Sequence, residues 1–119
     1  MHHTPTHKTI QQAILWSRPH QASCQRLVTV VSRATEVPVS LLLQANRSGK
    51  VARARQIAMY LSHVVLGHSL SEVGRAFGRD RTTVSYACAL VEDRRDDPAF
   101  DAEIDAIERQ LEEAGLVAE

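Results

Sequence analysis

The stretch "SLSEVGRAFGRDRTTVSYA", residues 69–87, decides how we expect this chain to fold. Apolar residues recur at helical spacing on both sides of Gly78, which predicts two short amphipathic helices joined by a tight turn. Ser71 can cap the first helix and Asp80 the second, because both side chains accept hydrogen bonds from free N–H groups at a helix start. The residues expected to face inward are Val73, Ala76 and Phe77 before the turn, and Val84, Ala87, Cys88 and Val91 after it.

Two short helices around a glycine-containing turn are typical of a helix-turn-helix, whose second helix lies in the DNA major groove and reads bases from its first residues. Here that helix starts with Arg81-Thr82-Thr83, which can hydrogen-bond base edges or pack a methyl group on thymine. The outward face is completed by Ser85, Tyr86 and Ala89. The same pattern also fits a solvated helix face that Asp80 caps. Separately, Tyr86 could be a core residue, although its position on the helical wheel favours exposure.

A second basic feature is "RSGKVARARQ", residues 47–56, at the start of a longer predicted helix. Its cations are Arg47, Lys50, Arg53 and Arg55. Positive charge opposes the helix dipole here, so a bound phosphate would compensate, although a solvated surface is the ordinary alternative. Residues 46–95 carry nine basic and four acidic side chains, net +5, whereas residues 96–119 carry one against nine, net −8. The formal net charge of +0 therefore conceals a basic surface that favours a polyanion.

The remaining segments also show helical spacing, without a strand or a repeat, so the predicted fold class is all-α. The first helix is expected from about residue 22, Pro38 opens a short helix, and Gly67 ends the longer one. Asp97 is expected to cap the last helix, with Pro98 as its first residue. The buried stripes are expected to be Leu27, Val28, Val31 and Ala34; Ile57, Leu61, Val64 and Val65; and Phe100, Ile104, Ile107 and Leu111.

Length and composition set the class of protein. A chain of 119 residues suits one domain, and we expect a flexible N-terminal arm at 1–20 and a helical domain at 21–115 with an acidic C-terminal helix. No apolar run approaches the roughly 20 residues of a membrane span, and no signal peptide is evident. Cys24 and Cys88 are expected to be reduced thiols, which predicts a cytoplasmic, nucleoid-associated protein without a membrane partner.

We expect no enzymatic activity, cofactor or metal. The sequence offers no convergent carboxylates and no nucleophile–base set, and its histidines lack the i, i+4 spacing with glutamate of a zinc enzyme. Gly49-Lys50 superficially fits a phosphate loop, but Gln44 and Val51 stand where a Walker motif has glycine and serine or threonine. We therefore expect no nucleotide partner.

Three motifs resemble the C-terminal DNA-binding domain of the bacterial replication initiator DnaA: "VARARQIAMYLS" (51–62), "HSLSEVGRAFG" (68–78) and "RDRTTVSYAC" (79–88). That family shows V-A-R-P-R-Q, S-L-P-E-I-G and G-G-R-D-H-T-T-V in the same order. The resemblance runs from about residue 22 to residue 100. It implies a TrpR/DnaA-domain-like helical fold that reads a short duplex box, with one helix in the major groove and a loop arginine in the minor groove.

The resemblance also implies roles for individual residues. Arg47 corresponds to the minor-groove arginine, Arg55 and Gln56 to contacts at the next helix start, and Thr82 and Thr83 to major-groove readers. The full set of expected DNA-binding residues is Arg47, Lys50, Arg53, Arg55, Gln56, Ser71, Asp80, Arg81, Thr82, Thr83, Ser85 and Tyr86.

Three departures from the family pattern bear on the bound sequence. Arg81 replaces the signature histidine, Tyr86 replaces a frequent histidine one turn later, and one glycine before Arg79 is missing. Ser71 stands where the family usually has proline, near a backbone contact. These differences leave the target sequence open.

The function we expect is sequence-specific binding of double-stranded DNA by a stand-alone relative of the initiator domain without its ATPase module. Such a protein would regulate transcription or replication by occupying initiator-like boxes. The alternative is an interaction module that has lost DNA binding and docks a protein partner, or a second copy, through its acidic C-terminal helix. The presence of Arg47, Arg55, Thr82 and Thr83 favours DNA.

Overall fold

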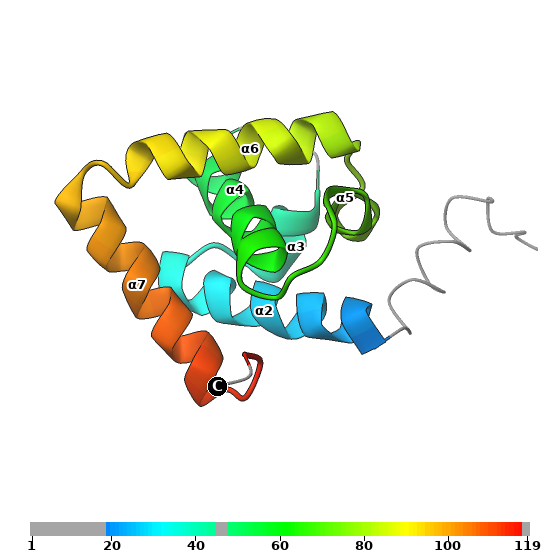
Figure 1. Cartoon of the computed structure of the whole chain (residues 1–119), viewed down its shortest axis with the longest axis horizontal. Coiled ribbons are helices and arrows are strands. Elements are labelled where there is room, and N and C mark those ends of the chain that lie inside the picture. Colours follow the sequence, from blue (N-terminus) through cyan, green and yellow to red (C-terminus); the bar gives the residue numbers. More distant parts are fainter. Residues whose placement is uncertain (1–18, 45–47, 118–119) are drawn as a thin grey trace, which may run out of the picture.

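The computed structural model describes residues 19–44 and 48–117, and within these ranges the regular structure is entirely helical (Figure 1). The all-α prediction is therefore confirmed for the described part of the chain. The helices are α2 (Pro19–Thr35), α3 (Val39–Leu43), α4 (Gly49–Val64), α5 (Leu70–Phe77), α6 (Arg81–Arg94) and α7 (Pro98–Glu113). None of these helices has the length and apolarity that crossing a membrane requires. The predicted arm lies mostly outside the described residues.

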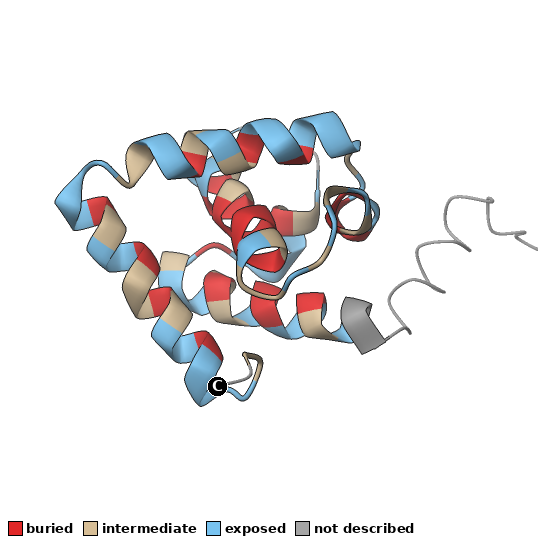
Figure 2. Cartoon of the chain, in the orientation of Figure 1, coloured by how far each residue is buried: buried red, intermediate tan, exposed pale blue. Residues whose placement is uncertain are grey.

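Helix α4 is the centre of the fold, because α2, α3, α5 and α6 all pack against it (Figure 1). Most of its residues between Val51 and Ser62 are buried, which Figure 2 shows as red on several sides of the helix. Ile57 and Leu61 are buried as predicted. The prediction for Val64 is wrong: its side chain is 52% exposed, because burial in this enclosed helix depends on position along the axis more than on one face.

Helix α2 begins at Pro19, earlier than the predicted residue 22, and packs against α4 and α7. Its buried row runs through Cys24, Leu27, Val28 and Val31. The predicted inward position of Ala34 is wrong, since Ala34 is exposed. Thr35 continues the row instead, half-buried and with its hydroxyl donating to the Val31 carbonyl at 2.7 Å.

Helices α5 and α6 form the predicted helix-turn-helix, but Ser71 is not the cap of α5. Ser69 takes that position: its Oγ accepts from the Glu72 N–H at 3.1 Å, and the Glu72 carboxylate accepts from the Ser69 N–H at 2.8 Å. This reciprocal capping box needs an acid or amide three residues after the cap, and only Ser69 has one. Gly78 ends the helix as predicted, with a left-handed φ of 66°.

Helix α7 starts as predicted, with Asp97 as cap and Pro98 as its first residue. Its apolar stripe is buried and packs on α2 of the same chain (Figure 2). At the far end of α7, the Arg26 guanidinium donates to the Ala114 carbonyl at 2.5 Å. The stripe consists of Phe100, Ile104, Ile107 and Leu111.

Candidate nucleic-acid interface

The start of α6 is built by a capping carboxylate and carries an exposed polar face. Asp80 accepts the Thr83 N–H at 2.8 Å, and this hydrogen bond, together with the one from the Thr83 hydroxyl, lowers the pKa of the Asp80 carboxyl. Val84 and Ala87 are buried on one side of α6, so the opposite side of its first turns faces outward. Tyr86 is 67% exposed, so its predicted exposure is confirmed and a place in the core is excluded. The exposed residues at this end are Arg81, Thr82, Thr83, Ser85 and Tyr86.

The start of α4 presents two cations. Ser48 caps the helix by accepting the Val51 N–H at 3.3 Å, and Lys50 and Arg53 are both exposed in the turn that follows. Arg53 folds back along the helix, so that its guanidinium lies beside Gly49. The free N–H groups of a helix start and two cations together make a suitable site for a phosphate. Arg47 lies outside the described residues.

The first three turns of α4 lie beside the first two turns of α6, although Gly49 and Arg81, which begin the two helices, are 32 residues apart in the sequence. A small pocket lies between α4 and the first two turns of α6. Gln56, Thr83 and Tyr86 line it, together with Arg55 and Arg79. The expected contact residue Gln56 is thus half-buried at the edge of the α6 face. Ser71 lies apart from this pocket, exposed in the first turn of α5.

Arg55 does not lie on the surface where a contact with DNA would place it. Its side chain is buried, with a residue exposure of 7%, and it donates hydrogen bonds to the carbonyls at the end of α3. Burial lowers the pKa of its guanidinium, and the nearby charge of Arg79 lowers it further. Sequence spacing could not separate Arg55 from exposed Arg53, because the two belong to the same basic run.

In the sequence, Arg79 is notable because a glycine of the family pattern is missing directly before it. In the structure, Arg79 connects two parts of the site. Its Nη1 donates to the Phe77 carbonyl at 2.6 Å and its Nη2 to the Gln44 carbonyl at 3.0 Å. Gln44 is 35 residues away along the chain. No local pattern in the sequence indicates such a contact.

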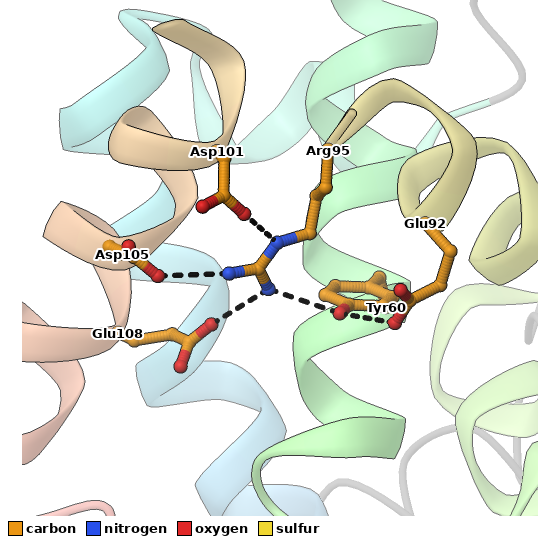
Figure 3. Close-up of polar contacts among 6 residues, drawn as sticks. All are labelled: Tyr60, Glu92, Arg95, Asp101, Asp105 and Glu108. Atoms are coloured by element: carbon orange, nitrogen blue, oxygen red, sulfur yellow. Dashed lines mark hydrogen bonds and ion pairs between the residues drawn. The ribbon is translucent and has the colours of Figure 1, made fainter. Parts of the chain in front are cut away.

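The acidic part of the chain lies at the other end of α6. Arg95, just after α6, binds Asp101 at 2.5 Å, Asp105 at 2.9 Å and Glu108 at 3.1 Å, all on α7 (Figure 3). It also donates to the Tyr60 hydroxyl at 3.1 Å. The hydrogen bonds to Asp101, Tyr60 and Glu108 raise the pKa of Arg95, the one to Asp101 most.

This arrangement separates the charges. The 14 residues of α6 span about 20 Å at about 1.5 Å per residue. Three acids of α7 bind Arg95 beyond the far end of α6, so the length of that helix separates Arg95 from the helix start, and the Debye length at physiological salt is only about 8 Å. The repulsion between these acids and an anion bound at the start of α6 is strongly screened. Figure 1 shows α7 leaving α6 at the end opposite to α5.

The structure thus contains two helices that are each buried on one side and joined by a tight turn. The second helix has an exposed polar start. These features define a helix-turn-helix domain. Residues 24–91, more than half of the chain, match the family described as bacterial dnaA protein helix-turn-helix. The chain belongs to this family. Membership supports DNA binding related to replication initiation.

Individual relatives agree with this assignment. The chain is 36% identical over 108 residues to the chromosomal replication initiator protein DnaA of Rhodopseudomonas palustris strain BisA53, covering 89% of this chain and 23% of that protein. It is 34% identical over 108 residues to the protein of the same name from Bradyrhizobium sp. strain BTAi1, with the same coverage. A crystal structure of a DNA replication initiation factor superposes with a TM-score of 0.73 and 32% identity, over 87% of this chain and 32% of that one. The chain thus spans about a quarter to a third of the length of these relatives.

Proposed function

We propose that this chain binds double-stranded DNA sequence-specifically, with the start of α6 in the major groove. The observation that carries the proposal is the exposed face of α6, where an arginine, two threonines, a serine and a 67% exposed tyrosine are held outward by a buried stripe behind them. Such a face offers hydrogen-bond donors, acceptors and methyl groups to base edges. A helix face that contacts only solvent does not require this combination of donors, acceptors and methyl groups.

Within this proposal the residues divide into four groups. Arg81, Thr82, Thr83, Ser85 and Tyr86 face the bases, and Asp80 holds the helix start in shape. The phosphate contacts come from the start of α4, and from α5, which crosses the DNA backbone. Arg47 is proposed as the minor-groove arginine because of the resemblance alone. The proposed phosphate contacts are Lys50, Arg53, Gln56 and Ser71.

We further propose that the protein regulates transcription or replication by occupying initiator-like boxes, in association with the nucleoid. The distance between α7 and the start of α6 supports occupancy, since the acids do not lie against the proposed DNA. The interaction-module alternative is less well supported, because the apolar stripe of α7 is buried within its own chain.

A salt titration of binding to a selected duplex tests DNA binding directly. Each neutralised phosphate contributes about −0.9 to the slope of log K against log salt, so we expect a slope of roughly −3 to −6. Lys50→Met should make the slope shallower by about 0.9. Arg33→Met removes the same charge from the exposed end of α2, across α4 from α6, and should leave the slope unchanged. A wild-type slope near zero, or equal effects of the two variants, would contradict the proposed surface.

A further inference from the structure

Two arginines converge on one main-chain oxygen beside the proposed interface. The carbonyl of Gln44 accepts from Nη2 of Arg55 at 2.7 Å and from Nη2 of Arg79 at 3.0 Å. A carbonyl oxygen has two lone pairs and can accept both. Gln44 is the residue that ends α3, four positions before the cap of α4.

Each arginine also donates hydrogen bonds to other main-chain carbonyls. Arg55 donates from Nε to the Leu42 carbonyl at 2.9 Å. It also donates from Nη2 to the Leu41 carbonyl at 3.2 Å, which accepts the Gln44 N–H as well. Arg79 donates from Nη1 to the Phe77 carbonyl at 2.6 Å, in the turn before α6. The Gln44 carbonyl thereby links α4, which carries Arg55, to the turn that leads into α6.

We propose that Arg55 and Arg79 are positioning residues of the DNA-binding surface, which hold α4 and the start of α6 in a fixed relation because both donate to the Gln44 carbonyl at the end of α3. The inference rests on the proposed DNA binding. It assigns to these two arginines a role through the protein's own main chain, and leaves the phosphate contacts to other cations such as Lys50.

The planar fork of arginine explains why this residue type is needed. Its N–H groups point in fixed directions and can serve two carbonyls at once, whereas the ammonium of lysine is a compact point charge on a flexible stem. A residue that binds phosphate by charge alone tolerates lysine. A residue that holds two carbonyls of different segments does not.

The test compares Arg79→Met and Arg79→Lys with the wild type in the same salt titration, with Lys50→Met as the reference for a lost phosphate contact. Arg79→Met should weaken binding of the folded protein by about tenfold while the salt slope stays that of the wild type, because hydrogen bonds from a charged group are lost but no phosphate contact is. Arg79→Lys keeps the charge and should stay closer to Arg79→Met than to the wild type.

Two results in this titration would overturn the inference. A slope shallower by about 0.9 in Arg79→Met, with full recovery in Arg79→Lys, would make Arg79 a phosphate contact. A lower melting temperature with unchanged affinity of the folded protein would leave Arg79 a purely structural role.

Hydrogen–deuterium exchange on the free protein provides a reading that does not depend on DNA. Peptides covering residues 41–52 should exchange faster in Arg79→Met than in the wild type, and those covering α7 should not change. Equal exchange over 41–52 would overturn the inference even if DNA affinity falls. If the wild type binds no duplex, the proposed function fails and the positioning of a DNA surface fails with it, while the exchange data still decide whether the carbonyl links the two segments.

Discussion

Gly74 is the position where one methyl group should do most damage to the helix-turn-helix. A Cβ added to Gly74 would lie 2.4 Å from the carbonyl oxygen of Arg79 and 3.4 Å from the carbonyl carbon of Asp80. Both atoms belong to the main chain, so no side-chain rotation relieves the contact. The turn would have to move away, although Gly78 and Arg79 both donate their N–H groups to the Gly74 carbonyl, the latter at 2.8 Å.

The size of the effect follows from these contacts. Overpacking costs about 1–3 kcal/mol, and each of the two weakened hydrogen bonds adds up to about 1 kcal/mol. Alanine recovers about 1 kcal/mol of helix propensity. We therefore expect Gly74→Ala to lower the free energy of unfolding by about 2–3 kcal/mol, or the melting temperature by about 8–12 °C for a domain of this size.

Thermal unfolding followed by circular dichroism provides the measurement. Gly49→Ala is the matched control, because Gly49 is also helical but its added Cβ meets only the mobile guanidinium of Arg53, at 3.3 Å. Its melting temperature should equal or exceed that of the wild type, because the helix propensity that alanine adds is not opposed by main-chain atoms. A Gly74→Ala protein that melts at or above the wild-type temperature would refute the reasoning.

Three further outcomes are expected. Ser69→Ala should lower the free energy of unfolding by about 1 kcal/mol through loss of the cap, and Ser71→Ala should change it by less than about 0.5 kcal/mol; equal losses in chemical denaturation would contradict the capping assignment. Because the Thr83 N–H lowers the pKa of Asp80 in the folded state, the carboxylate stabilises the fold at neutral pH and this contribution is lost as the pH falls below about 4. Asp80→Asn should therefore show a flatter loss of melting temperature below that pH, and superimposable profiles would count against it. Arg81→His should change base preference at one position in a binding-site selection, by about 1–3 kcal/mol; an unchanged motif would leave base reading to the other exposed residues of α6.

Local signals in the sequence were sufficient where a feature depends on residues a few positions apart. Asp80, Gly78 and the Asp97-Pro98 pair mark helix ends by side-chain or backbone chemistry that acts within one turn, and all three predictions are confirmed. Ser71 was mispredicted although the signal for Ser69 was present, since only Ser69 has an acid three residues later. Val64 was mispredicted because periodicity describes a buried face, whereas burial in α4 depends on position along the axis, and Val64 is the last residue of the helix.

The sequence alone determined the helix-turn-helix, the polar and basic start of its second helix and the separation of basic from acidic residues along the chain, because periodicity, capping and charge runs are local properties. Tertiary structure alone decided which cations face outward. Arg53 and Arg55 are two residues apart in one basic run, yet one is exposed and the other is buried against the end of α3. Which carbonyls lie beside a side chain depends on how distant segments pack, so the shared contact of Arg55 and Arg79 with Gln44 could not be predicted from the spacing of charges.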